Sequence, residues 1–353
     1  MNRTANETRA SLWAILDRES AELHPAYFAL VMATGIVSIA CHLLGMDLLA
    51  LPLFYLNQLF YAALWLLTLG RLFRHLPRIL ADLTSHNLSA GFLTLVAGTN
   101  VLGSQFVILE ADQPTALALW IVGLVLWIVL IYAFFALMTI KEQKPPLEGG
   151  INGAWLLTVV STQSVAVLGT LIAPRFGAWQ EIFLFAMLCF FLLGCMFYIL
   201  VISLIFYRFM FFKLNPQELT PPYWINMGAV AITTLAGANI ILSGNYPFLA
   251  DMMSFIEGFT LFFWAIGTWW IPLLLVFGGW RHLYKHQMLT YHPLYWGLVF
   301  PLGMYTVCTF QLARALEVDF LLAIPRYFVY LAIAAWLVTF FGLVVQIGKK
   351  LAP

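Results

Sequence analysis

The sequence predicts an all-α integral membrane protein in which ten transmembrane helices form five parallel helical hairpins around a central axis. Composition, the length of the apolar segments and an internal repeat support this fold class. Of the 353 residues, 63% are hydrophobic and 9% are charged, whereas a soluble globular chain carries about 25% charged residues. Apolar segments long enough to cross a bilayer recur along the whole chain. A soluble core cannot bury so many uncharged segments.

Ten segments are predicted to span the membrane. They cover residues 25–44, 52–71, 87–108, 115–138, 152–173, 180–207, 222–242, 251–279, 293–315 and 325–347. One transmembrane domain, 25–347, is therefore expected between a lead-in of residues 1–24 and a tail of residues 348–353. Residues 7–23 are expected to form either an amphipathic helix on the membrane surface or a short solvated helix. The charged lead-in lacks a short apolar segment with a cleavage site, so no signal peptide is expected.

The distribution of positive charge predicts the orientation. With ten spans, 14 of the 17 Lys and Arg residues fall on the side of both termini, and only Arg175, Arg314 and Arg326 fall on the other side. Cytoplasmic loops carry the excess of Lys and Arg. Both termini are therefore expected in the cytoplasm, with the protein crossing the inner (plasma) membrane of the cell several times.

An internal repeat relates the odd-numbered spans. HPAYFALVMATGI (24–36) matches HPLYWGLVFPLGM (292–304) at six positions in register, and TPPYWINMGAVAI (220–232) repeats the pattern of proline, tyrosine and aromatic residue. The odd spans begin 62 to 71 residues apart, and every one begins on the cytoplasmic side. The repeats are therefore parallel, unlike the inverted repeats of many secondary carriers.

Polar residues concentrate in the odd spans. Residues 94–105, 158–164 and 226–239 contain many Ser, Thr, Asn and Gln, whereas residues 116–138 and 181–202 of the even spans contain none. Polar side chains in a bilayer face protein or water rather than lipid. The odd helices are thus expected to form an inner ring around a polar conduit, and the even helices an outer shell. The same small and polar residues also serve as contacts between packed helices, and this alternative stays open.

Three motifs resemble those of a known family. HPAYFALVMATGI in span one, FLTLVAGTNVLGSQF (92–106) in span three and WGLVFPLGMY (296–305) in span nine are similar to the tellurite-resistance/dicarboxylate transporter (TDT) family. That family contains TehA-like proteins and the plant guard-cell slow anion channels. The resemblance implies a homotrimer in which each protomer has its own pore, lined by odd-numbered helices and occluded by a phenylalanine of span nine. The matching position here is Phe300.

Phe300 is accordingly expected to act as a pore gate, together with Pro301 and Met32. Pro301 removes one backbone hydrogen bond and bends a helix, which would aim the ring toward the central pore axis. The internal alignment places Met32 and Gly228 at the depth of Phe300. The alternative is that Phe300 packs between helices beside an ordinary membrane kink.

Nine further positions are expected to line the pore because they lie in the odd spans. They are Gly35, Thr94, Thr99, Asn100, Gln163, Asn226, Gly228, Thr233 and Gly303.

Glu257 in span eight is a possible group for pH sensing or coupling, because carboxylates within a membrane are costly and often functional. It is alternatively an outer-leaflet group that pairs, for example with Arg314. His24, His86 and His292 stand at the cytoplasmic mouths. Protonated histidines there would attract anions, although plain interfacial histidines are the simpler interpretation.

No arrangement of residues indicates an enzyme. The sequence contains no Ser–His–Asp pattern, no Gly-rich phosphate loop after a strand and no metal-ligand spacing. No catalytic residue, metal or cofactor is therefore expected, and nothing indicates nucleic-acid binding.

The leading hypothesis is an anion channel or facilitator that moves small inorganic or organic anions. Its selectivity would come from pore width, hydroxyl and amide donors and the cost of dehydration. The alternatives are a proton-linked transporter of C4-dicarboxylates such as malate, or a tellurite-resistance exporter. The sequence does not separate these substrates.

Overall fold

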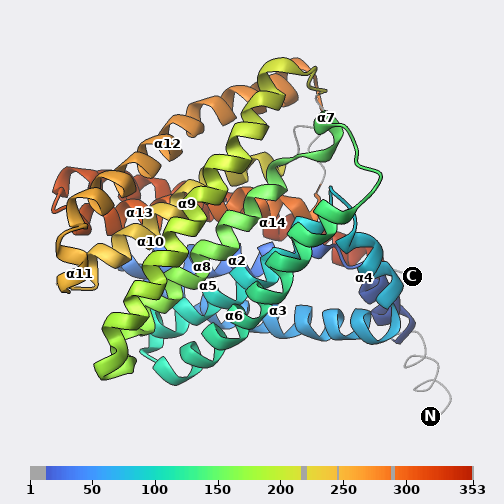
Figure 1. The fold of residues 1–353 in the computed structure, drawn as a ribbon. Coiled ribbons are helices and arrows are strands. Elements are labelled where there is room, and N and C mark those ends of the chain that lie inside the picture. The colour runs from blue at the N-terminus through green and yellow to red at the C-terminus, as the bar shows by residue number, and fades with distance from the viewer. Residues whose placement is uncertain (1–12, 216–220, 245, 288–290, 352–353) are drawn as a thin grey trace, which may run out of the picture.

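The computed structural model describes residues 13–215, 221–244, 246–287 and 291–351, and every regular element in these ranges is a helix. Figure 1 shows a bundle of long helices that run roughly side by side. Residues 13–21 are helical. The first part of the lead-in helix expected over 7–23 lies outside the described residues.

Five helices begin in the same way, with a short 3₁₀ turn that continues into an α-helix. The pairs are η1 (Pro25–Phe28) with α2 (Ala29–Leu43), η2 (Ser89–Phe92) with α5 (Leu93–Glu110), η3 (Gly153–Leu156) with α8 (Leu157–Ile172), η5 (Pro221–Trp224) with α10 (Ile225–Leu242), and η7 (Pro293–Tyr295) with α13 (Trp296–Ala315). Three of the turns have a proline at their first or second position, where its missing N–H is not needed. The repeat noted in the sequence thus corresponds to a repeated local structure.

Five other long helices alternate with these along the chain. They are α3 (Asp47–Arg74), α6 (Gln113–Ile140), α9 (Gln180–Phe211), α12 (Met253–Gly279) and α14 (Ala323–Leu351). A π-helical turn, Trp280–Tyr284, extends α12, and a 3₁₀ turn η8 (Asp319–Leu322) precedes α14. Short helices α4 (Leu76–Leu83), α7 (Leu147–Gly150) and α11 (Pro247–Ala250) lie in the connections.

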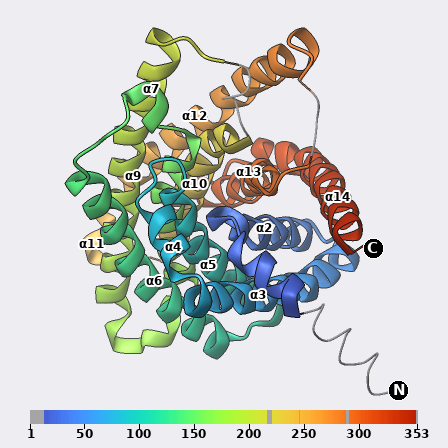
Figure 2. The same cartoon turned by 90° about the vertical axis from the view of Figure 1, so that its right-hand side faces the viewer.

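The first set of helices closes into an inner ring. Helix α2 packs against α5, α5 against α8, α8 against α10, α10 against α13, and α13 returns to α2. The 3₁₀ turns contact one another in the same cyclic order. Each of the alternating helices packs mainly on the outside of the inner helix that precedes it in the chain. Figure 2 shows α2 and α5 inside the bundle, with α3, α6 and α14 around them.

Burial separates the two layers. In the most apolar windows of α2, α5, α10 and α13 with their leading turns, 78–89% of the residues are buried, whereas the figure is 22–28% for α3, α6, α12 and α14. The outer helices expose rows of Leu, Ile, Val and Phe. Such an apolar outer surface is stable in lipid and not in water.

Within the described residues, nine helical segments are long and apolar enough to cross a membrane, against the ten predicted. One of them, residues 153–211, is 59 residues long. It contains α8, a 3₁₀ segment η4 (Ala173–Trp179) and α9, and Gly177 inside η4 has φ 51° and ψ −118°, far from helical values. Because α8 and α9 pack against each other, the segment folds back on itself at η4.

The two described ends of the chain meet. Lys350 near the end of α14 donates from Nζ to the Glu19 carboxylate at 2.7 Å, and Ser20 Oγ donates to the Leu67 carbonyl of α3. In Figure 1 this end of the bundle also carries α4 and α7, whereas α11 lies at the opposite end. The 3₁₀ turns of the inner ring begin on the side of α4 and α7.

Candidate functional site

Three cavities follow one another along the axis of the inner ring. The first, called the vestibule, contacts one residue of every leading turn: Ala26, Gly91, Ala154, Pro222 and Leu294. It comprises about 990 Å³ of space between atoms, part of it open to solvent. All five inner helices thus point their N-terminal ends at one cavity.

The inner cavity adjoins the vestibule, since Ala26, Ala154, Pro222 and Leu294 line both, and it extends about one to two helical turns further along the inner helices. Its lining includes Met32, Thr94, Leu157, Ile225 and Phe300, one residue from each. Apart from Thr94, the residues around this cavity are apolar or glycine, so it offers an anion few hydrogen-bond donors.

The outer cavity follows another turn or two along the same helices. Ile36, Val101, Ser164, Ile232 and Met304 again represent each inner helix. Other lining residues are polar, namely Asn100, Ser104, Asn239 and Gln311. The order of residues along each helix therefore stacks the vestibule, the inner cavity and the outer cavity on a single axis.

Phe300 lies where the inner cavity ends. Gly297, one turn before it, lines the inner cavity, and Met304, one turn after it, lines the outer cavity. The Phe300 side chain is 1% exposed, so the ring is enclosed by neighbouring side chains at the end of the inner cavity. Met32 holds the equivalent place on α2, because Ile36, one turn later, lines the outer cavity.

Pro301 has a specific partner on the neighbouring inner helix α10. It lies inside α13, and a Cβ built on Gly228 of α10 would be 2.9 Å from Pro301 Cγ. The Pro301 ring therefore sits where α10 has no side chain. Since proline carries no N–H, the Gly297 carbonyl one turn earlier loses its usual helical donor. Gly297 lines the inner cavity, and non-ideal backbone at membrane depth is tolerated where it is buried in protein or lines a cavity.

Of the other expected lining residues, Thr94 and Asn100 contact the cavities. Thr94 lines the inner cavity, and its hydroxyl donates to the Gly91 carbonyl at 2.7 Å. Asn100 borders the outer cavity, where its Nδ2 donates to Ser164 Oγ at 3.0 Å. Its Oδ1 turns toward α6, since a Cβ on Gly123 would lie 2.4 Å from it. The Asn100 Oδ1 atom is therefore turned away from the axis, and its Nδ2 already donates one hydrogen bond to Ser164.

Four residues expected to line the pore have other surroundings, and two of them are hydrogen-bonded to a neighbouring helix. Thr99 Oγ1 pairs with the Tyr61 hydroxyl of α3 at 3.1 Å, and Gln163 Nε2 donates to the Phe191 carbonyl of α9 at 3.0 Å. Thr233 Oγ1 donates to the Ala229 carbonyl of its own helix. Asn226 is fully buried, and neither its Oδ1 nor its Nδ2 has a hydrogen-bond partner among the described residues. None of the four borders the three cavities, and their place along a conducting pathway stays a prediction.

The glycines of the inner ring allow helices to approach closely. A Cβ on Gly35 would meet Val101 at 2.6 Å, and one on Gly303 would meet Ile36 at 2.7 Å. Gly228 is in the same situation against Pro301. The structure places these positions at the contacts between inner helices, and not on the cavity walls.

Glu257 lies on the outer helix α12 and is half-buried. It borders none of the three cavities, and no ion pair joins it to Arg314 or to another described residue. Its position is that of a shell residue.

Three histidines lie at the vestibule end of the inner ring, and one of them, His24, lines the vestibule. His24 Nδ1 accepts a hydrogen bond from the Ala26 N–H, and His292 Nδ1 accepts one from the Leu294 N–H, so they cap η1 and η7. Their rings meet edge to face with centroids 5.9 Å apart. Burial, with a contribution from His292, lowers the pKa of His24 to about 4. Burial also lowers the pKa of His292 and of His86. These histidines are therefore neutral near pH 7 and do not supply positive charge there.

Arg208 is a vestibule residue that the sequence analysis did not single out. It lies near the end of α9, is 6% exposed and lines the vestibule. Its Nη1 donates to the Ile151 carbonyl at 2.9 Å and to the Tyr223 hydroxyl. In the sequence it follows an apolar outer span and reads only as an orientation signal. Its side chain reaches the vestibule because of how α9 packs on the inner helices, and the hydrophobic periodicity of the sequence does not predict that packing.

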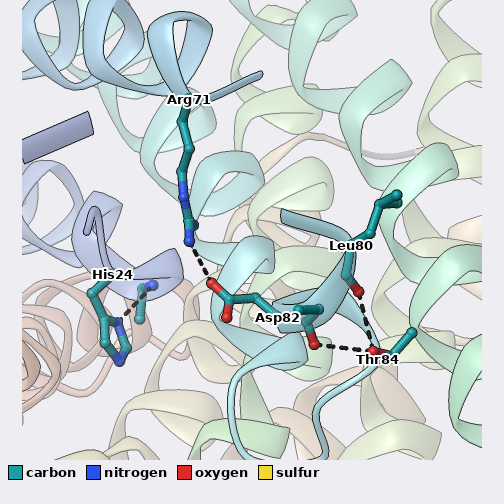
Figure 3. A network of polar contacts seen from close by, with 7 residues as sticks. His24, Arg71, Leu80, Asp82 and Thr84 are labelled. Atoms are coloured by element: carbon teal, nitrogen blue, oxygen red, sulfur yellow. Dashed lines mark hydrogen bonds and ion pairs between the residues drawn. The ribbon is translucent and has the colours of Figure 1, made fainter. Parts of the chain in front are cut away.

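A second buried arginine at the same end of the molecule has a different environment. Arg71 Nη2 lies 2.7 Å from Asp82 Oδ2, and the pair sits near His24 (Figure 3). Asp82 belongs to α4, whose end is closed by Thr84 Oγ1 donating to the Leu80 carbonyl. Arg71 does not line the vestibule, and its charge is balanced by Asp82.

No group of three or more His, Cys, Asp or Glu that could hold a metal ion occurs among the described residues.

Comparison with known proteins identifies the family. The family model described as SLAC1, voltage-dependent anion channel, matches residues 22–344. The chain is 38% identical to an uncharacterized membrane protein of Mycobacterium tuberculosis over 143 residues, 40% of this chain and 73% of the relative. It is 27% identical to an uncharacterized transporter of Methanocaldococcus jannaschii, covering 80% of this chain and 81% of that protein. It is 21% identical to the sulfite efflux pump SSU1 of Trichophyton rubrum, over 90% of this chain and 88% of that protein. The chain therefore belongs to the SLAC1 family of anion channels and transporters, the TDT family that its motifs resemble.

Proposed function

We propose that this protein is an anion channel or facilitator that carries small anions along the axis of the inner ring. The observation that carries the proposal is the convergence of five helix N-termini on the vestibule. The N-terminal end of a helix carries about half a positive charge and presents N–H groups. Five such ends around one cavity attract anions without a ring of basic side chains.

The topology that supports this function has ten spans. The segment 153–211 would be about 90 Å long as one straight helix at 1.5 Å per residue, three times the thickness of the hydrocarbon core. Its return at η4 divides it into two spans. The contact between Glu19 and Lys350 requires an even number of crossings, and the excess of Lys and Arg places both ends in the cytoplasm. We place the protein in the plasma membrane, with the outer helices facing lipid or the other subunits of a homotrimer.

In this proposal Phe300 closes the pathway together with Met32. An apolar constriction stops ions by excluding water, even where it does not fill the whole opening. On either side, the donors of the vestibule and of the outer cavity replace part of the hydration shell. The conducting state requires the Phe300 ring to move away from the axis, toward a neighbouring helix.

A channel or facilitator accounts for the cavities better than a proton-coupled carrier. Coupled carriers keep ionisable groups within the membrane, whereas the half-buried Glu257 lies on an outer helix away from the axis. The name of the sulfite efflux pumps favours a small inorganic oxyanion among the substrates of this chain as well.

Reversal potentials test the proposal. Purified protein in liposomes is placed under opposed gradients of nitrate or chloride and of protons. A reversal potential that follows the anion gradient and ignores pH supports the channel. A reversal potential that follows the proton gradient contradicts it and supports coupled transport.

A further inference from the structure

We propose that the amides of Asn239 and Gln311 form an anion-binding site at the far end of the outer cavity, which takes a small monovalent anion such as nitrate or a halide. The inference rests on the proposed function and names two residues that determine affinity on the side of Phe300 away from the vestibule. There an anion meets neutral N–H donors in place of helix N-termini.

Asn239 and Gln311 lie at the same level on two neighbouring inner helices. Ile232 of α10 and Met304 of α13 line the outer cavity, and Asn239 and Gln311 follow them by seven residues each and line it as well. Seven residues are nearly two turns, so each helix presents the same face about 10 Å further out. Since α10 and α13 pack against each other, the two amides approach the axis from adjacent helices.

Both amides are available to a ligand. The Asn239 side chain is 6% exposed and lines the cavity. The Gln311 Oε1 is buried without a hydrogen-bond partner, which leaves the NH2 group as the end of the amide that the cavity reaches. No hydrogen bond joins either side chain to another residue in the described part of the chain. Because an enclosed amide without a partner is costly, a ligand that accepts hydrogen bonds is stabilised here.

The other polar residues of this cavity already have partners. Asn100 Nδ2 donates to Ser164 Oγ, and the hydroxyls of Ser104 and Ser164 donate to the Asn100 and Ser161 carbonyls of their own helices. They therefore serve the packing of α5 and α8 in part. Asn239 and Gln311 are the polar lining residues without such a structural use.

Electrostatics makes donors necessary at this end. The N-termini of the inner helices converge on the vestibule, so their C-termini lie on the side of the outer cavity. A helix C-terminus carries about half a negative charge and repels anions. The lining contains no charged side chain. Arg314 follows Gln311 by three residues on α13, but it is exposed, and water and salt screen its attraction.

The composition of the wall favours singly charged anions. Its other residues around this level are apolar: Ile39, Leu43, Ile108, Leu171, Leu235 and Val307. In such surroundings a hydrogen bond to an anion is stronger than in water. Two neutral amides replace only part of a hydration shell, and the cost of losing that shell rises steeply with the charge of the ion. Nitrate and halides are therefore accepted, whereas sulfate is not.

The test measures currents in excised membrane patches, with nitrate varied on the side of the outer cavity and Phe300→Ala as the common background. Gln311→Met and Asn239→Leu keep the approximate size and remove the amide, so each is expected to raise the half-saturating nitrate concentration about threefold, and both together about tenfold. Gln311→Glu replaces the NH2 group by a charged oxygen and is expected to raise it further than Gln311→Met. Sulfate on the same side is expected not to compete, and competition would contradict the preference for monovalent anions.

Gln113 of α6 provides the matched control. Its Oε1 is also buried without a partner, but it borders none of the three cavities, so Gln113→Met should leave the half-saturating concentration unchanged. Unchanged half-saturation in the double variant overturns the proposal. Equal values in Gln311→Met and Gln311→Glu also overturn it, because the residue then acts through its size alone. If one variant does not fold, the single variants at the other position decide by the same criteria.

Crystals soaked in sodium bromide test the site without any current. Anomalous density beside the Asn239 and Gln311 amides is expected in the unmutated protein, and its loss is expected in the double variant. Density that is missing from the unmutated protein, or that persists in the double variant, overturns the site. Absence of anion current in the Phe300→Ala background contradicts the proposed function instead, and the bromide density then decides the site alone.

Discussion

The Phe300 ring of α13 lies directly over Gly228 of α10, where a methyl group would be 3.4 Å from its Cδ1 atom. The absence of a side chain at position 228 leaves room for Phe300 and Pro301 together, so α10 and α13 approach closely at the level where the inner cavity ends. Because Gly228 has no side chain, the Phe300 ring has room to rotate beside it. In the proposed closed state, the constriction would therefore involve two helices and not the phenylalanine alone.

Replacing Phe300 by alanine should open the pathway. Removal of the ring joins the inner and outer cavities, so Phe300→Ala is expected to raise anion conductance at least tenfold in planar bilayers or oocytes. Burial of the ring predicts a stability cost of about 3 kcal/mol. Phe263 of α12 is equally buried but borders none of the three cavities, so Phe263→Ala should cost similar stability without raising conductance. A folded Phe300→Ala protein that conducts like wild type would show that the pathway closes elsewhere.

Adding a methyl group at Gly228 should disturb the contact between α10 and α13 from the α10 side. At 2.9 Å from Pro301 Cγ, the new Cβ has to push α13 away or press the Phe300 ring into the axis. Gly228→Ala is expected to lower thermal stability by about 1–3 kcal/mol and to reduce conductance further. Gly258 of α12 has no atom within 4 Å of its Cβ position, so Gly258→Ala should be neutral or slightly stabilising. Equal melting temperatures for the two variants would argue against the close contact.

The sequence indicates the two layers correctly because polarity and helix burial are linked in a membrane. Odd spans rich in Thr and Asn became buried inner helices, and the spans without them became the exposed shell. The motif beginning with His and Pro corresponds to the capped 3₁₀ turns of η1 and η7. These features are local, so a single sequence contains them.

The direction of individual polar side chains was not predictable in the same way. Gln163 follows Thr162 and precedes the cavity residue Ser164, yet its side chain turns to α9. Asn100 borders the outer cavity, but its amide is shared between Ser164 and α6. A helix that is buried all round shows no polar face, so its sequence does not reveal which side meets the axis. Arg208 was overlooked for a related reason, since it comes from an outer helix and reaches the vestibule through tertiary packing.

Cysteine accessibility should distinguish the cavity walls from the contacts between helices. In a background without the native cysteines, Ser164→Cys and Asn239→Cys are expected to react with a water-soluble thiol reagent from outside the cell, because both positions line the outer cavity. Gln163→Cys is the matched control, one residue away but facing α9. Leu126→Cys on α6 serves as the second control. Equal labelling of positions 163 and 164 would rule out the proposed position of the axis.

Acid should destabilise the vestibule end of the inner ring through His24. Its pKa is lowered to about 4 by burial and by His292, with Asp82 acting in the opposite direction and Arg71 in the same one. The unfolded chain, with an ordinary pKa near 6.5, therefore binds more protons between pH 6.5 and 4. The contribution of neutral His24 to stability is complete above pH 6.5 and is lost as the pH falls toward 4, where protonation of Nδ1 also removes the acceptor for the Ala26 N–H. His24→Asn keeps an N-cap acceptor and cannot titrate. The melting temperature of the wild type is expected to fall more than that of His24→Asn between pH 7 and pH 5. Parallel curves for the two proteins would mean that His24 is not the acid-sensitive group.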